Sequence, residues 1–215
     1  MVANLSTVTK IETDTWVRAT WEEFLRVAYN PVYLQGRSYY DLGHMRIEMA
    51  ALGSSHGHDN ALLSIILTLF TTLKKIRVQQ FLNTSFRREG LQECQPDCAF
   101  YIGDDFKVLP RGNSPIDVDL VGAPSLIIEI GASSINDDLG RKRVLYERLG
   151  VREYWAVDVA VAEVFAFSVA EGRSGRIEVS EVLSGLAMAT VEEALRRGWQ
   201  EDDAAIGQWL MELFV

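Results

Sequence analysis

Three polar side chains lie at positions that a buried core does not favour, and together they could hydrolyse phosphodiester bonds. Glu129 lies inside the apolar run Leu126–Ile130, where a charged carboxylate is costly unless a partner or ligand compensates it. Asp97 follows Pro96 at the entry to a short apolar segment, and proline there fixes the backbone and removes a hydrogen-bond donor. Lys142 is the third candidate because of its place on a predicted helix.

A helical projection separates Lys142 from the other basic residues of its segment. We expect a helix that begins at Asn136 or Asp137 and ends at Leu149, with Gly150 as its C-cap. At helical spacing Lys142 falls in the middle of its apolar stripe. This helix directly follows the strand of Glu129, so it should pack back across the sheet and bring the ammonium near both carboxylates. The stripe consists of Leu139, Leu145, Tyr146 and Leu149.

Two carboxylates and a lysine form a set that suits metal-dependent phosphodiester hydrolysis. Carboxylate oxygens are hard ligands for Mg²⁺, and the bound ion polarises the phosphate and lowers the pKa of the attacking water. A lysine can orient that water or offset charge in the transition state. Each residue also has a purely structural interpretation: Asp97 as a turn residue, Glu129 as the buried partner of an arginine, and Lys142 as a stem covering apolar surface.

The apolar patterns predict an α/β fold with a mixed central sheet flanked by helices, with added β-hairpins. The run 124–130 is apolar enough to be a central strand covered on both faces. A long helix, entered through the polar loop 54–60 and ending near Ile76, is apolar on nearly every side and should be central or part of a subunit interface. The other expected elements are a helix over 15–28, a hairpin over 39–49 turning at Leu42-Gly43, strands over 77–86, 98–102, 153–159, 161–169 and 176–183, loops over 104–115 and 171–175, and two helices from Val191 onward.

Composition and charge limit the class of protein. The chain has 215 residues, 48% hydrophobic and 24% charged, which suits one domain over 1–215 with an N-terminal helical lead-in (1–38) and C-terminal helices (190–215). A net charge of -9 and a pI near 4.9 argue against a general nucleic-acid coat but not against a nuclease, whose site carboxylates are negative. Cys94 and Cys98 are too few for a four-thiolate zinc site, and free thiols fit the cytoplasm. The sequence indicates neither a secretory signal nor a membrane span.

Several segments, in order along the chain, resemble the Uma-type restriction endonuclease family, a cyanobacteria-rich branch of the PD-(D/E)XK nuclease superfamily. The resemblance runs from about Tyr39 to Leu186, and its most distinctive piece is Gly150–Asp158. It implies a restriction-endonuclease-like fold, in which Asp97, Glu129 and the Ile130 backbone carbonyl hold the metal and Lys142 assists the water. The wider superfamily has its lysine two positions after the glutamate, here Gly131, whereas the Uma-type pattern puts it on the following helix, as Lys142 is. The other matching segments are 93–102, 124–130, Asp138–Lys142 with Tyr146, Arg46–Met49 with His58, and Ser184–Leu186.

Further residues are weaker candidates for the same site. Glu48 could supply a third carboxylate through water, His58 could carry a proton, and Tyr146 is a possible auxiliary residue from the family pattern. The structural interpretations are a solvent-facing strand residue for Glu48 and a solvated helix-start residue for His58. A basic rim facing phosphate could be formed by Arg87, Arg88 and Arg141.

The leading interpretation is a DNA endonuclease that depends on Mg²⁺, with Mn²⁺ as a possible substitute. A homodimer is expected because two nearby sites can cut two strands, and the long apolar helix and the chain end could form its interface. The alternatives are a catalytically silent nuclease-fold binding or regulatory module, and a metal-dependent phosphodiesterase acting on RNA or nucleotides. The apolar residues near the chain end are Trp199, Trp209, Leu210, Leu213 and Phe214.

Overall fold

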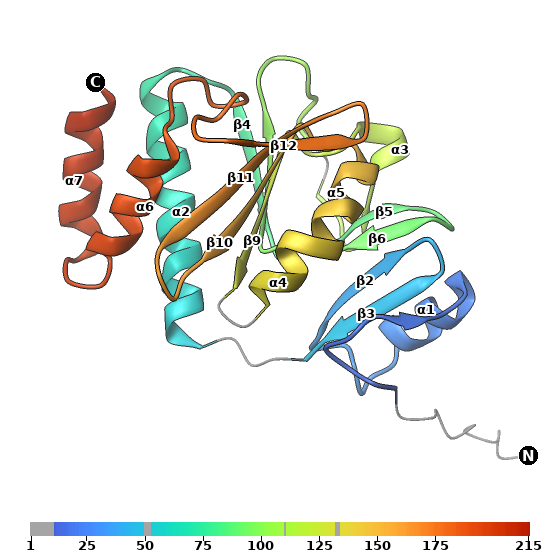
Figure 1. Cartoon of the computed structure of the whole chain (residues 1–215). Coiled ribbons are helices and arrows are strands. Elements are labelled where there is room, and N and C mark those ends of the chain that lie inside the picture. Colours follow the sequence, from blue (N-terminus) through green and yellow to red (C-terminus); the bar gives the residue numbers. More distant parts are fainter. Residues whose placement is uncertain (1–10, 50–52, 110, 132–133) are drawn as a thin grey trace, which may run out of the picture.

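Two six-stranded sheets and the helices packed on them make up the computed structural model, which describes residues 11–49, 53–109, 111–131 and 134–215 (Figure 1). The central sheet has the strand order β12-β11-β10-β9-β7-β4. Of the neighbouring strands described in it, β9 and β10 run parallel and the others antiparallel, which confirms the predicted mixed sheet. Its strands are β4 (Val78–Leu82), β7 (Cys98–Ile102), β9 (Leu126–Gly131), β10 (Glu153–Asp158), β11 (Glu163–Ala170) and β12 (Arg173–Ile177).

The second sheet contains the predicted hairpin and has the order β1-β3-β2-β6-β5-β8. Leu42 and Gly43 form the hairpin turn with φ of 43° and 87°, the positive values that a tight two-residue turn requires. Helix α1 (Trp21–Ala28) packs against this sheet through a small apolar cluster around Phe24. The strands are β1 (Val17–Arg18), β2 (Arg37–Asp41), β3 (His44–Glu48), β5 (Phe86–Arg88), β6 (Gln92–Cys94) and β8 (Ile116–Asp117).

Helices cover both faces of the central sheet. Helix α2 (Ser54–Leu73) lies between the sheet and the C-terminal helices α6 (Met188–Arg197) and α7 (Asp203–Phe214). Its buried apolar side chains, Leu62, Leu63, Ile66, Leu67 and Phe70, give it the predicted central position, whereas Ile65 and Leu69 are only half-buried. Helix α5 (Arg143–Leu149) packs on the opposite face and also contacts the second sheet (Figure 1). None of the described helices combines the length and apolarity needed to cross a membrane.

The two faces of strand β9 pack against different helices. Successive side chains of a strand point to opposite faces, and Ile128 and Ile130 join the cluster around α2, whereas Ile127 joins the cluster around α5. Glu129 therefore points toward α5. All residues of β9 are buried, so the prediction of a central strand covered on both faces is confirmed.

The N-terminal helix was predicted too long. It begins at Trp21 rather than near residue 15, because Thr20 and Glu23 form a reciprocal capping box at that point. The preceding residues Val17 and Arg18 form β1 and pair with β3 instead. The expected helical lead-in over 1–38 thus includes a strand, and its residues 1–10 lie outside the described part of the chain.

The single strand predicted over 77–86 is wrong. The chain breaks at Asn83, whose φ is 49°, a left-handed conformation that asparagine tolerates better than most residues. Strand β4 before the break pairs in the central sheet and β5 after it pairs in the second sheet. The connection through Asn83 therefore leads from the central sheet into the second sheet.

Other boundaries also differ from the sequence prediction. Helix α2 already starts at Ser54 and ends at Leu73, just before Lys75 takes a left-handed φ of 56°. The strand expected over 176–183 is β12, which begins earlier because the hairpin turns at Glu171-Gly172. Helix α6 starts at Met188, before Val191. The sequence reading also missed β6, β8 and the short helix α3 (Val118–Val121).

The helix predicted from Asn136 or Asp137 to Leu149 is present but irregular. A helical turn, α4 (Ile135–Asp137), is followed by a π-helical turn over Asp138–Lys142 and then by α5. Such π turns occur frequently at functional sites. The helix ends at Gly150, whose φ is 92°, as the C-cap prediction required.

Replacing Gly150 by alanine is expected to destabilise the protein by about 1–2 kcal/mol, since a Cβ disfavours the left-handed conformation. Gly57 offers a matched control: it lies within α2 and an added Cβ there meets nothing within 4 Å. Gly57→Ala should leave stability unchanged or raise it by about 0.4–1 kcal/mol. Urea denaturation of both variants measures the difference; equal effects would contradict the assignment of Gly150 as a left-handed cap.

Candidate active site

Asp97 and Glu129 lie next to each other at one end of the central sheet. Strands β7 and β9 are antiparallel with Cys98 opposite Ile128, so Asp97 and Glu129 are the next opposing positions. Both carboxylates are buried, with exposed fractions of 0% and 1%. The backbone N–H of Ile130 donates to Asp97 Oδ2 at 2.8 Å. The sheet thus holds two carboxylates side by side where the hydrogen-bonded pairing of β7 with β9 ends.

The Lys142 ammonium reaches this point from the helix on the same face. Its Nζ lies 2.8 Å from Glu48 Oε1, 3.0 Å from Asp138 Oδ1 and 3.8 Å from Glu129 Oε2. The residue is 1% exposed, and its Nζ is 4.5 Å from the centre of the Tyr39 ring. The expectation from the helical projection, that Lys142 points inward toward the carboxylates, is confirmed.

Glu129 is held by two tyrosine hydroxyls. Tyr146 donates to Glu129 Oε1, and Tyr39 donates to the same oxygen at 3.3 Å. Burial raises the pKa of Glu129 to about 8, although the nearby Lys142 opposes the shift. Tyr146, expected from the sequence as an auxiliary residue, therefore contacts the site directly.

Comparison with known proteins identifies the family. The profile of the Uma2 family, described as putative restriction endonucleases, matches residues 21–207. The chain belongs to the Uma2 family. A solved structure of similar fold is the crystal structure of a putative nuclease of DUF820 from Anabaena variabilis ATCC 29413, with 18% identity, a TM-score of 0.55, and coverage of 82% of this chain and 99% of that one. The search of curated proteins found no match. The restriction-endonuclease-like fold class predicted from the sequence is confirmed.

Arg37 is a member of this candidate site that the sequence interpretation missed. Its Nη1 contacts Asp97 Oδ1 and lies 3.9 Å from Glu129 Oε2, and its Nη2 lies 3.5 Å from Glu48 Oε2. One guanidinium thus bridges three carboxylates. The sequence could have indicated Arg37, because a two-residue turn at Leu42-Gly43 sets the hairpin register and places Arg37 directly opposite Glu48.

The histidine at the site is His56 rather than His58. His56 Nε2 lies 3.0 Å from Asp97 Oδ1, whereas His58 Nε2 lies 2.7 Å from Asp203 Oδ1 on α7. Residues two apart in a helix point to different sides, and α2 already begins at Ser54. The placement of His58 beside the carboxylates is therefore corrected. The sequence interpretation did not predict that α2 begins as early as Ser54, and this start decides which histidine faces Asp97.

Asp138 is a further residue of the cluster that the sequence interpretation missed. It is 1% exposed and lies four positions before Lys142, to which it is paired. The wide π turn directs both residues inward. An acid and a lysine four residues apart on a helix form a common pair, and this spacing could have revealed Asp138.

The three arginines proposed as a phosphate-facing rim all have partners within the protein. Arg87 and Arg88 lie on β5 in the second sheet, and Arg141 lies in the π turn. The rim remains a prediction, and binding phosphate would require these side chains to share or leave their present contacts. The contacts are Glu93 for Arg87 at 2.6 Å, Asp119 for Arg88 at 2.9 Å, and the ring of Trp16 for Arg141 at 4.6 Å to its centre.

The surroundings shift the pKa values of the four carboxyl groups in opposite directions: burial raises those of Glu129 and Asp138, whereas those of Asp97 and Glu48 are lowered. Burial works against ionisation of Asp97, but the hydrogen bond from His56 and the charge of Arg37 bring its pKa below the ordinary value. Burial likewise opposes ionisation of Glu48, and Lys142 lowers its pKa. Burial alone would lower the pKa of Lys142, but Glu129, Asp138 and Glu48 outweigh it and raise that pKa. The neighbouring carboxylates therefore favour the charged form of Lys142.

The oxygen atoms at this point fit a hard divalent cation. Asp97 and Glu129 supply carboxylate oxygens, and the N–H and C=O of a strand residue point to the same side, so the Ile130 carbonyl shares the side on which its N–H meets Asp97. Over the described residues, no three His, Cys, Asp or Glu side chains converge as a metal site. Mg²⁺ commonly uses one or two carboxylates and retains several waters, so a set of two carboxylates and one carbonyl suits it.

Proposed function

We propose that this protein is a Mg²⁺-dependent endonuclease that hydrolyses phosphodiester bonds in DNA, with Mn²⁺ as a possible substitute. The observation that carries the proposal is the pair of adjacent buried carboxylates, Asp97 and Glu129, at the end of a central sheet, with the Lys142 ammonium 3.8 Å from Glu129. Membership of the Uma2 family, described as putative restriction endonucleases, supports the same reaction class.

Each residue of the site has a proposed task. Asp97, Glu129 and the Ile130 carbonyl hold the ion, which when bound polarises the phosphate and supplies an activated water. Lys142 remains protonated because three carboxylates surround it, so it acts as a donor or a charge and not as a general base. Glu48 and Asp138 position the ammonium, and neither needs to touch the substrate.

Cleavage of supercoiled plasmid, single-stranded DNA and RNA tests this proposal. The wild type should cut DNA with Mg²⁺ or Mn²⁺ and not with EDTA, whereas Asp97→Asn and Glu129→Gln should lose about a thousandfold or more in rate, since each removes a charged metal ligand. Glu163→Gln is the matched control, because Glu163 is exposed on β11. Light scattering on the same sample tests the homodimer expected from the sequence. Cutting that survives in both site variants would contradict the assignment, and cutting of RNA alone would change the substrate class.

One feature of the site favours the second candidate, a nuclease-fold module that binds without turnover. Asp97 and Glu129 already have cationic neighbours in the protein, Arg37 and Lys142. A carboxylate pair neutralised in this way can be a stable structural network. Absence of cleavage by folded wild-type protein on all three substrates, together with no Mg²⁺ binding in calorimetry, would establish this candidate instead.

A further inference from the structure

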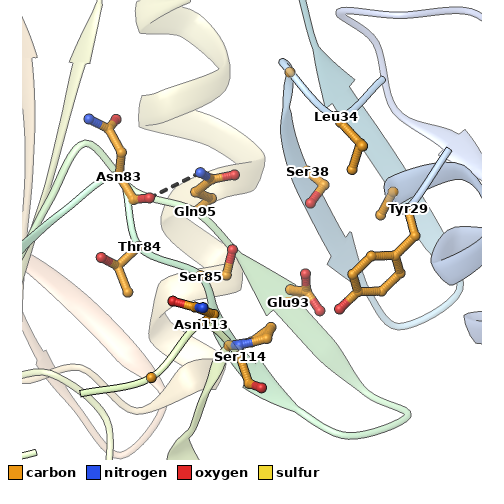
Figure 2. A pocket seen from close by; sticks show the side chains of 14 residues that line it. Tyr29, Leu34, Ser38, Asn83, Thr84, Ser85, Glu93, Gln95, Asn113 and Ser114 are labelled. Atoms are coloured by element: carbon orange, nitrogen blue, oxygen red, sulfur yellow. Dashed lines mark hydrogen bonds between the residues drawn. The ribbon is translucent and has the colours of Figure 1, made fainter. Parts of the chain in front are cut away.

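A hollow of about 340 Å³ opens on the face of the second sheet that carries Ser38 and Glu93, between this sheet and the loop before β8 (Figure 2). Its size is at the small end of ligand sites, which are roughly 300–1,000 Å³. Tyr29 and Ser38 lie on one side, and Ser85 and Asn113 lie on the other, as Figure 2 shows. Residues from four separate segments therefore form its walls.

The hollow is joined to the candidate active site by backbone contacts. Gln95, which lines it, is two residues before Asp97 and donates from Nε2 to the Asn83 carbonyl at 3.0 Å. The Asn83 N–H in turn donates to the Asp97 carbonyl at 3.1 Å. On the opposite wall, Gly36 precedes Arg37 and Ser38 follows it, and the Arg37 side chain points to the other face of β2. A ligand in the hollow would thus lie close to the backbone that leads into Asp97, and across the second sheet from the Arg37 side chain.

The chemistry of the walls suits an uncharged, flat ligand rather than a phosphate. Among the described residues that line the hollow there is no lysine or arginine, and Glu93 contributes a carboxylate that would repel an anion. Hydroxyls and amides predominate, and these groups hydrogen-bond to the edges of nucleobases. Within the described structure, no hydrogen bond occupies the side chains of Ser38, Ser85 or Asn113.

Tyr29 adds an aromatic surface. The residue is 57% exposed, and its hydroxyl accepts a hydrogen bond from Arg87 Nη2 at 2.9 Å, which holds the ring at one end. Single-stranded nucleic acids bind proteins by stacking bases on such rings. We propose that this hollow binds one unpaired nucleobase of the strand being cut. This inference rests on the proposed nuclease function and adds to it the source of base preference.

Binding to labelled single-stranded DNA octamers tests the inference separately from turnover, if it is measured by fluorescence anisotropy in the Glu129→Gln background. In that background Tyr29→Leu should weaken binding about tenfold, and Tyr29→Phe, which keeps the ring, should not. Ser38→Ala combined with Asn113→Ala should reduce the difference in affinity among dA, dC, dG and dT octamers. Leu120→Ala is the control, because Leu120 is exposed on α3 and lines a different hollow.

The outcomes separate the two proposals. Unchanged affinity and base preference in the Tyr29→Leu and Ser38→Ala/Asn113→Ala proteins would overturn the nucleobase site even if wild-type protein cuts DNA. The expected losses would support the site even if no cleavage is found. A duplex octamer distinguishes the source of the base: weaker binding of duplex than of single strand is expected, because a paired base must first leave the helix.

Discussion

Lys142→Met is expected to destabilise the protein by about 3–5 kcal/mol and to abolish Mg²⁺-dependent cleavage. The ammonium is fully buried among Glu48, Glu129 and Asp138, and removing one partner of a buried ion pair leaves its counter-charges without compensation. Chemical denaturation and plasmid cleavage measure the two effects on the same preparation. Lys74→Met is the matched control, since Lys74 is exposed at the end of α2, and should change stability by no more than about 0.5 kcal/mol.

A combined variant separates the structural contribution of Lys142 from its catalytic one. Adding Glu48→Gln and Asp138→Asn to Lys142→Met removes the two charges that lie closest to the ammonium. Most of the lost stability should return, because neutral amides are much less costly to bury than unpaired carboxylates. Cleavage should stay absent. Recovery of cleavage along with stability would show that Lys142 acts only as a structural residue.

Arg37→Met is expected to bind Mg²⁺ at least tenfold more tightly than the wild type. The Arg37 guanidinium contacts Asp97 and approaches Glu129, so a divalent cation at these carboxylates must overcome its positive charge. Isothermal titration calorimetry at fixed pH measures the affinity. The same variant should be less stable than the wild type without metal, and added Mg²⁺ should raise its Tm more than it raises that of the wild type, because binding to the folded state stabilises it.

Arg46→Met is the control for this effect. Arg46 pairs with Glu48 at 2.9 Å and lies 3.5 Å from Asp137, but it makes no ion pair with Asp97 or Glu129 within the described structure. Its removal should change the Mg²⁺ affinity by less than about threefold. Weaker Mg²⁺ binding by Arg37→Met would contradict the competition and would show instead that Arg37 holds the carboxylates in a geometry that the ion requires.

The parts of the site that could be predicted from the sequence are those set by local periodicity. The alternation along Leu126–Ile130 directs Glu129 to one face, and the helical projection directs Lys142 to the same space. Both follow from the spacing of side chains within a single element. The odd placement of Asp97 after Pro96 indicated the remaining carboxylate, and the antiparallel pairing of β7 with β9 then places it beside Glu129.

The features that the sequence did not predict depend on contacts between different helices and strands. Whether the chain from Arg77 to Phe86 remains one strand depends on the left-handed turn at Asn83, which exists because the two halves pair in different sheets. The choice between His56 and His58 depends on the residue at which α2 begins. Propensity alone determines neither, since tertiary contacts override it.

The candidate site joins segments that are far apart along the chain. Arg37 and Asp97 are 60 residues apart, and Tyr39 and Glu129 are 90 residues apart. Contacts between such distant residues carry a large loop-closure cost and generally form late in folding. A chain still emerging from the ribosome would therefore hold β2 and β3 long before the helix with Lys142 exists. The proposed nuclease site would assemble only after most of the polypeptide has been synthesised, so under that proposal incomplete chains would not cut the nucleic acid of the cell that makes them.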